Sequence, residues 1–246
     1  MIFGGIQKLT LLDYPEKTAC TLFTIGCNFL CPFCHNVSLI IEVEEQQNDN
    51  DYVSKVSQTQ GKKTITEPEV LEFLEARRGL LDGVCISGGE PLLQDNLECF
   101  IDKVKALGFL VKLDTNGSFP DKLEMLIKSG KIDYVAIDIK NSPKKYAETI
   151  GLPEYDISPI EKSMQILRTG MIPYEFRTTV VRDFHSPDDL FLIANWISWA
   201  DKYYLQGFIN SDGVLQKGLK AYTDSEMQMF LEEIKKILPT AELRAS

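Results

Sequence analysis

The sequence predicts an α/β fold with a parallel sheet, because strand-like and helix-like segments alternate about six times along the chain. Such alternation implies right-handed crossovers between neighbouring parallel strands. Polar clusters follow several of the apolar runs directly. In folds of this kind the chemistry gathers at the carboxyl ends of the strands. Six units are too few to close an eight-stranded barrel.

Six short apolar runs predict the strands of this sheet. In chain order they are Thr18–Ile25, Val84–Ser87, Leu110–Leu113, Tyr134–Ile137, Tyr174–Val181 and Tyr203–Phe208. Within the segment Gly4–Lys17, which precedes the first run, Asp13-Tyr14-Pro15 is interpreted as a turn before a strand.

Amphipathic patterns and end signals predict the helices. Thr66–Glu69 forms a capping box with Pro68 in the first turn, and Gly108 and Gly170 stop two later helices. The predicted helices run from residue 66 to about Arg78 and then over Asn96–Leu107, Lys122–Lys128, Pro159–Thr169, Asp188–Ala200 and Asp224–Leu238.

The length of 246 residues suits one α/β domain over 1–246, and a hydrophobic fraction of 44% supports a core. Residues 42–63 are almost entirely polar, so they predict a solvated, flexible insertion. A net charge of −10 argues against nucleic acid as the main partner. Met1–Gly5 lacks a signal-peptide pattern, and the longest apolar segment, Leu190–Ala200, is too short to span a membrane. We therefore expect a cytoplasmic protein.

The segment Cys27–Asn36 places three thiols at the spacing C-x3-C-x2-C, directly after a predicted strand. Such a loop can point three sulfurs at one face of a cubane iron–sulfur cluster, which normally takes four thiolates. An open metal position is typical of a catalytic site. A structural zinc site needs four ligands, and an electron-transfer ferredoxin needs a fourth cysteine nearby. No cysteine follows Cys34 until Cys85, so a non-catalytic iron–sulfur or zinc module is the weaker alternative.

The loop also resembles the cluster loop of radical S-adenosylmethionine (SAM) enzymes, since an aromatic residue, Phe33, precedes the third cysteine. The following His35-Asn36 is typical of the branch that activates glycyl-radical enzymes. The resemblance implies that Cys27, Cys31 and Cys34 hold a [4Fe-4S] cluster whose unique iron binds SAM. An electron from the reduced cluster then cleaves SAM to methionine and a 5′-deoxyadenosyl radical. It further implies a partial (β/α)6 barrel, open on one side to a large substrate.

Other motifs at strand ends resemble cofactor-binding elements of this family. Gly88–Pro91 resembles the methionine-binding element, in which two glycines allow close approach of the backbone and carbonyls or the Glu90 carboxylate accept bonds from the SAM ammonium. Asp114-Thr115 and Asp138-Ile139-Lys140 resemble the pyruvate formate-lyase activating enzymes. There two aspartates help bind a monovalent cation beside the SAM carboxylate, and the lysine lies near SAM. The alternative is that each aspartate caps a helix or turn.

Single residues add to this picture. Arg177 is a cation within an apolar strand, where unpaired charge is unfavourable. We expect it to face the barrel mouth and pair with the SAM carboxylate or with Asp138, or to form a structural ion pair. His35 and Asn36 can bond to ribose or adenine, and Phe33 can pack against adenine or stiffen its loop.

Residues away from these motifs receive simpler interpretations. Gln206 ends a strand and is predicted to touch the ribose or a peptide substrate, whereas His185 is predicted to be exposed in a polar loop. Cys20 and Cys85 lie in strands and are interpreted as packing residues. Cys99 lies beside the apolar face of its helix.

The opening, Gly4–Lys17, resembles that of the activating proteins of anaerobic ribonucleoside-triphosphate reductase, although Glu16 stands where that family has glycine. The resemblance implies that a glycine Cα hydrogen is abstracted from this reductase. Activation of pyruvate formate-lyase or another glycyl-radical enzyme, or a small-molecule reaction such as deazapurine formation, are the alternatives. A flavodoxin or ferredoxin is the expected electron donor. Residues 42–63 contain no cysteine, so we predict one cluster. Asn141–Asp156 and Gly207–Gly218 are predicted to contact the partner.

Overall fold

The computed structural model describes residues 1–40, 64–211 and 213–244, and within them one sheet has the strand order β3-β1-β2-β4-β5-β6-β7-β8-β9. The predicted insertion at 42–63 lies outside the described residues. The strands are β1 (Ile2–Thr10), β2 (Ala19–Thr24), β3 (Ile65–Thr66), β4 (Gly83–Gly88), β5 (Leu110–Thr115), β6 (Tyr134–Asp138), β7 (Tyr174–Val180), β8 (Tyr203–Gly207) and β9 (Ala241–Arg244).

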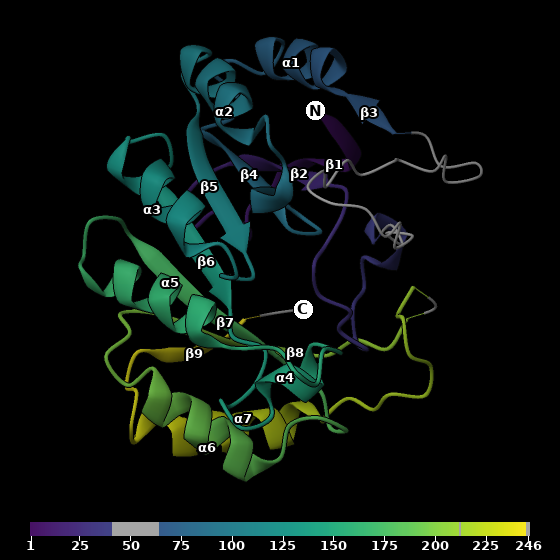
Figure 1. The fold of residues 1–246 in the computed structure, drawn as a ribbon, viewed down its shortest axis with the longest axis vertical. Helices are drawn as coiled ribbons and strands as arrows, with labels where there is room; N and C mark the ends of the chain where they lie inside the picture. The colour runs from purple at the N-terminus through teal and green to yellow at the C-terminus, as the bar shows by residue number, and fades with distance from the viewer. Residues whose placement is uncertain (41–63, 212, 245–246) are drawn as a thin grey trace.

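The sheet is parallel from β2 through β9, whereas β1 runs antiparallel to both β2 and β3. Among the described strands β3 and β9 are the two edges and do not pair with each other, so the sheet stays open. Figure 1 shows the helices on the outside of the curved sheet. The predicted α/β fold with an open parallel sheet is confirmed.

Six of the described helices match the predicted segments, with ends that differ by a few residues, whereas the short helix Tyr146–Thr149 was not predicted. The described helices are α1 (Glu67–Glu75), α2 (Leu97–Ala106), α3 (Pro120–Lys128), α4 (Tyr146–Thr149), α5 (Ser158–Arg168), α6 (Pro187–Trp196) and α7 (Asp224–Lys235), with short 3-10 helices η1 (Val37–Leu39) and η2 (Pro91–Leu93). Thr66 and Glu69 form the predicted capping box of α1. None of the described helices is long and apolar enough to cross a membrane.

Three strands were not predicted from the sequence. The turn predicted at Asp13-Tyr14-Pro15 is confirmed, but the strand before it, β1, was not predicted, although it pairs with β2 over much of its length. Its two central glycines hide the strand pattern. The short strands β3 and β9 exist through pairing with β1 and β8. Local sequence carries little trace of such long-range pairing.

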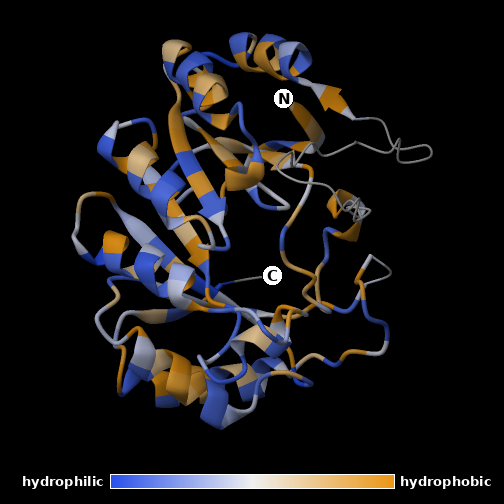
Figure 2. Ribbon diagram, viewed as in Figure 1, coloured by the Kyte–Doolittle hydropathy of each residue, from blue (hydrophilic) through white to orange (hydrophobic). Residues whose placement is uncertain are grey.

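Side chains of the central strands alternate between an apolar outer layer and a polar interior. Val111 and Leu113 of β5 belong to the main apolar core, whereas Lys112 between them takes part in the buried ion pairs described below. Successive strand residues face opposite sides of a sheet. In Figure 2, β5 is accordingly coloured with alternating hydrophobic and hydrophilic bands. The predicted burial of Cys20 and Cys85 is confirmed.

Candidate active site

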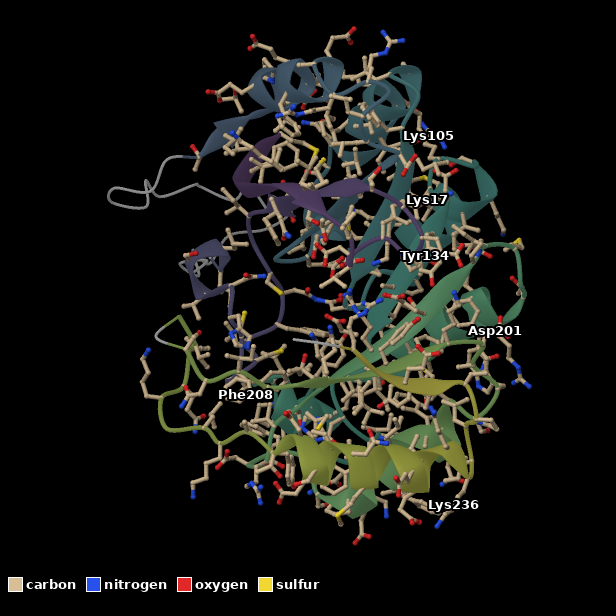
Figure 3. The ribbon with its side chains drawn as sticks, turned by 180° about the vertical axis from the view of Figure 1, so that it is seen from behind. Lys17, Lys105, Tyr134, Asp201, Phe208 and Lys236 are labelled. Carbon is tan, nitrogen blue, oxygen red and sulfur yellow. The ribbon has the colours of Figure 1, made fainter. Side chains whose placement is uncertain are left out.

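An open cavity of about 210 Å³ lies where the carboxyl ends of the parallel strands meet the cysteine loop. Phe208, just after β8, marks this carboxyl-end side, and Asp201, just before β8, lies on the opposite side of the view in Figure 3. The cavity is lined by Cys27, Phe29, Cys31, Phe33, Cys34, His35, Asn36, Ile40, Ser87, Gly88, Gly89, Asp114, Thr115, Asn116, Asp138, Lys140 and Thr179. The predicted site residues Glu90 and Arg177 lie outside this lining.

The three thiols of the cysteine loop share this cavity. Cys31 is 7% exposed, and Cys27 and Cys34 are half-buried. Burial raises the pKa of the Cys27 thiol to about 12 and that of Cys31 to about 11, although the nearby Lys140 ammonium opposes the shift. Metal binds the thiolate form, so loading the site with metal releases protons from these groups.

The donor set fits an iron–sulfur cluster better than a structural zinc ion. Within the described ranges, no group of three or more His, Cys, Asp or Glu side chains gathers around one metal position. Structural zinc requires four ligands converging on one ion. In a cubane cluster each thiolate binds a different iron atom, so the sulfurs need not converge on one point. Three thiols that line one cavity without converging fit this arrangement.

Two distant loops hold the cysteine loop in place. The amide of Leu30 donates to the carbonyl oxygen of Ile150 at 2.9 Å, and the amide of Gln216 donates to that of Pro32 at 2.8 Å. Ile150 follows α4 and Gln216 follows β8, so both belong to segments that the sequence assigned to a partner interface. Part of their backbone thus supports the site itself, and contact with a partner stays a prediction.

Gly88 and Gly89 are required by contacts within the chain. A Cβ atom on Gly88, whose φ is +119°, would lie 2.3 Å from the amide nitrogen of Thr24. A Cβ on Gly89 would lie 1.8 Å from the carbonyl oxygen of Gly26. The glycines therefore let this turn pack against the end of β2, whereas the sequence explained them by close approach of a ligand.

The carboxylate of Glu90 supports the cavity wall from behind. Glu90 is fully buried and accepts hydrogen bonds from Thr115 Oγ1 at 2.8 Å, the Asn116 amide at 2.7 Å and the Leu92 amide at 3.0 Å. It therefore fixes the end of β5 and the start of η2, and it does not itself line the cavity. Burial raises the pKa of Glu90 from its ordinary 4.5 to about 7, against the effect of these bonds.

This raised pKa predicts a pH-dependent stability. Between about pH 4.5 and 7 the folded protein keeps a proton on Glu90 that the unfolded chain has lost, so the free energy of unfolding falls as pH rises. Glutamine cannot titrate. From pH 5.5 to 8, the wild type should lose about 2 kcal/mol relative to Glu90→Gln.

Urea unfolding of the cluster-free protein at several pH values measures this difference. Glu75→Gln is the matched control, because Glu75 is exposed and pairs only locally with Arg78. Parallel pH profiles for the wild type and Glu90→Gln would contradict the prediction.

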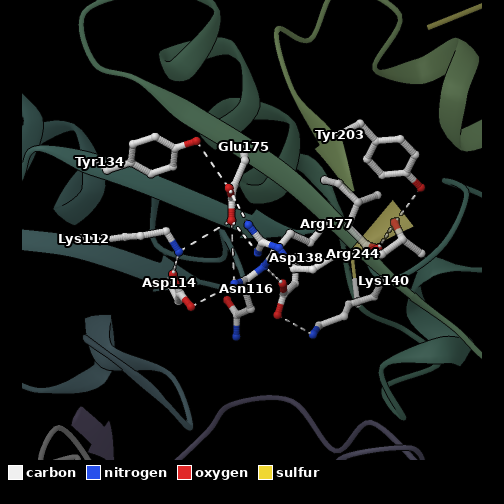
Figure 4. A network of polar contacts seen from close by, with 12 residues as sticks. Lys112, Asp114, Asn116, Tyr134, Asp138, Lys140, Glu175, Arg177, Tyr203 and Arg244 are labelled. Carbon is white, nitrogen blue, oxygen red and sulfur yellow. Dashed lines mark hydrogen bonds and ion pairs between the residues drawn. The ribbon is translucent and has the colours of Figure 1, made fainter. Parts of the chain in front are cut away.

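Arg177 lies between two aspartates at the inner end of the cavity (Figure 4). Its Nε donates to Asp138 Oδ1 and its Nη1 to Asp114 Oδ2, both at 2.9 Å. Lys140 Nζ donates to Asp138 Oδ2 at 3.0 Å, and Lys112 Nζ bonds to Asp114 Oδ1. Although burial opposes it, the neighbouring cations hold the pKa of both aspartates below the ordinary value. The predicted pairing of Arg177 with Asp138 is confirmed.

A second layer of charge lies deeper in the barrel. Glu175 is fully buried and accepts two bonds from the Arg244 guanidinium, at 2.9 and 3.1 Å, and one from the Tyr134 hydroxyl at 3.3 Å. Lys112 Nζ is 3.6 Å from Glu175 Oε1. Lys112 and Glu175 were missed from the sequence. The signal that identified Arg177, a charge within an apolar run, would have found them too.

Aromatic and imidazole rings form the other side of the cavity. Phe33 is 4% exposed and packs against Phe184, with ring centroids 5.7 Å apart. His35 packs against Phe208 at 5.4 Å, and burial lowers its pKa. Asn36 Nδ2 donates to the carbonyl of Gly88 at 3.3 Å, which joins the cysteine loop to the glycine turn.

His185 is buried, so the prediction that it is exposed was wrong. Its Nδ1 lies 3.1 Å from the Val181 amide, and its Nε2 lies 2.7 Å from the carbonyl oxygen of Lys140. The ring also contacts Phe33 edge-on. Backbone groups thus satisfy both ring nitrogens, which allows a histidine in a polar loop to fold inward.

Some lining residues were missed, and Gln206, like Glu90 and Arg177, does not line the cavity. The missed residues are Phe29, Ile40, Ser87, Asn116 and Thr179. Most adjoin predicted motifs or end a strand, so their position at the sheet edge was the available signal. Gln206 is the last residue but one of β8 and lies outside the lining.

The sequence was compared with protein families and with known proteins. The model of the Radical SAM superfamily matches residues 21–196. A protein of Methanocaldococcus jannaschii named “Putative glycyl-radical enzyme activating enzyme” is 34% identical over 221 residues, which cover 86% of this chain and 81% of the relative. Pre-heme d1 synthase of Dinoroseobacter shibae is 28% identical over 200 residues, covering 79% of this chain and 44% of that enzyme.

Solved structures share the fold at low sequence identity. Streptococcus suis SuiB, in its complex with the precursor peptide SuiA, superposes with a TM-score of 0.67 and 13% identity. The match covers 91% of this chain and 48% of SuiB, so the chain spans about half the length of that protein. At this identity the similarity concerns the fold alone.

Proposed function

Because the chain belongs to the radical SAM superfamily, we propose that it is an activating enzyme that creates a glycyl radical on a partner protein. The observation that carries the proposal is one cavity in which Cys27, Cys31 and Cys34 face the glycine turn after β4 and the polar ends of β5 and β6. The relative from M. jannaschii, which is named for glycyl-radical enzyme activation, matches most of this chain and supports this class over others in the superfamily.

In this proposal Cys27, Cys31 and Cys34 would hold one [4Fe-4S] cluster. Bound there and reduced, the cluster would supply the electron for cleavage of SAM to methionine and a 5′-deoxyadenosyl radical, which would abstract the glycine Cα hydrogen. Lys140 lines the cavity, and its ammonium has three N–H donors, of which one bonds to Asp138. It would bind the carboxylate of SAM.

The remaining lining residues would orient SAM and restrict water. Thr115 is fixed from behind by Glu90, so its hydroxyl is held in one place beside the glycine turn. His35 and Asn36 would bond to the nucleoside, and Phe33 would pack against adenine. Phe29 and Phe33 are almost fully buried apolar walls, which limit side reactions of a radical with solvent.

The proposed partner is anaerobic ribonucleoside-triphosphate reductase, with a flavodoxin or ferredoxin as electron donor. The opening segment, which resembles activating proteins of that reductase, supports this choice. A small-molecule radical SAM reaction is the second candidate, favoured by the match to pre-heme d1 synthase. The single domain over 1–246 and the cytoplasmic location stay predictions.

Electron paramagnetic resonance on an anaerobic mixture tests the proposal. The mixture contains the cluster-loaded protein, a reductant, SAM and the ribonucleotide reductase of the same cell, grown with α-deuterated glycine. We expect a glycyl-radical signal that appears only when SAM is present. We also expect the 5′-deoxyadenosine that forms to carry deuterium taken from the glycine. 5′-Deoxyadenosine without the signal would overturn this partner and keep the radical chemistry. Neither product, with the cluster intact, would contradict the catalytic proposal.

A further inference from the structure

The two aspartates at the inner end of the cavity have all their carboxylate oxygens engaged by nitrogen cations (Figure 4). Asp114 accepts from Lys112 on one oxygen and from Arg177 on the other. Asp138 accepts from Arg177 on one oxygen and from Lys140 on the other. The sequence resemblance assigned these aspartates to a monovalent cation, which would need the same oxygen atoms.

The charge of the wider cluster also disfavours an added cation. The connected network holds the carboxylates of Asp114, Asp138 and Glu175 and the cationic groups of Lys112, Lys140, Arg177 and Arg244. The cations outnumber the carboxylates by one. Charges in a buried site interact strongly, so an inorganic cation would have to displace one of the cationic side chains already bonded to these oxygen atoms.

The cationic groups have little freedom to leave. Lys112 is fully buried, and the side chain of Arg177 is 10% exposed. If either side chain moved away, a buried carboxylate would lose its cationic partner, which is unfavourable. Lys140 differs, because it lines the cavity with 19% of its side chain exposed. Among these cations, Lys140 is therefore the one that can contact an anionic ligand in the cavity.

We infer that this chain binds SAM without an inorganic monovalent cation, because the guanidinium of Arg177 takes that position between Asp114 and Asp138. The residues present do not fit the cation that the resemblance implied. Arg177 acts as a positioning residue here: it holds both aspartates, and through Asp138 it orients Lys140 toward the carboxylate of the ligand. The inference rests on the proposed binding of SAM.

Calorimetric titration of SAM into the cluster-loaded, unreduced wild type tests it. The titration is run in tetramethylammonium, sodium and potassium chloride at equal ionic strength. We expect the Kd for SAM to agree within about twofold across the three salts. A Kd tenfold or more tighter in sodium or potassium overturns the inference and leaves the proposed function standing. No binding in any salt overturns the proposed function and the inference with it.

A substitution tests the role of Arg177 itself. Arg177→Met removes the charge at similar length and leaves the two aspartates facing each other. It should make SAM binding at least tenfold tighter in potassium or sodium than in tetramethylammonium, and Arg177→Lys should reduce this difference. Broadening of the ²³Na resonance by the cluster-free variant gives a readout independent of SAM.

Arg182→Met is the matched control, because Arg182 pairs with Glu226 on α7 and lies outside the cavity lining. It should bind SAM equally in all three salts. If Arg177→Met folds and shows neither salt dependence nor sodium broadening, Arg177 does not occupy a cation position. The wild-type titration decides the inference even if that variant fails to fold.

Discussion

Replacing Cys31 with alanine is expected to abolish both the iron–sulfur cluster and the cleavage of SAM. Cys31 is the middle thiol of the loop and the most buried of the three. The other cysteines offer no substitute: Cys20 and Cys85 are buried within β2 and β4, and Cys99 lies on α2. Two remaining thiolates are too few for a cluster that needs three ligands and keeps one iron open.

Iron and sulfide analysis, visible absorbance and 5′-deoxyadenosine formation measure this effect. Cys99→Ala is the control, because it also removes one thiol but leaves the cavity intact. It should match the wild type in cluster content and SAM cleavage. A Cys31→Ala protein that keeps a full cluster would show that the ligands are assigned to the wrong residues.

The site residues that could be predicted from the sequence are those that belong to local motifs. The cysteine loop, the glycine turn and Asp114, Asp138 and Lys140 each follow an apolar run directly, and parallel strands bring their carboxyl ends together. Once the apolar runs were interpreted as parallel strands, these groups could be placed around one cavity, although the distances between them could not be predicted.

The part that the sequence did not predict depends on partners far along the chain. β1 and β9 form by pairing with β2 and β8. His185 is buried because it bonds to the backbone at Lys140 and Val181, which its polar neighbours do not indicate. The role of Glu90 also changed, because it holds other residues of the wall and does not line the cavity. Arg177 pairs with Asp138 as predicted but lies outside the cavity lining.

Substituting Gly89 with alanine is expected to be strongly damaging although it adds only one carbon. The new Cβ would lie 1.8 Å from the carbonyl oxygen and 2.5 Å from the carbonyl carbon of Gly26. Both are backbone atoms directly before Cys27, and the amide of Glu90 donates to the same oxygen at 2.7 Å. No side chain can move aside, so the glycine turn and the cysteine loop must separate.

We expect Gly89→Ala to lower the free energy of unfolding by about 3 kcal/mol, the upper end for overpacked sites, and to lose SAM affinity and cluster content together. Gly5→Ala is the control, because its Cβ would meet only a side-chain atom of Phe23 at 3.8 Å. Urea unfolding and SAM titration on both variants measure the effects. If Gly89→Ala kept the stability and SAM affinity of Gly5→Ala, the close packing of the glycine turn against the cysteine loop would not be what holds the site together.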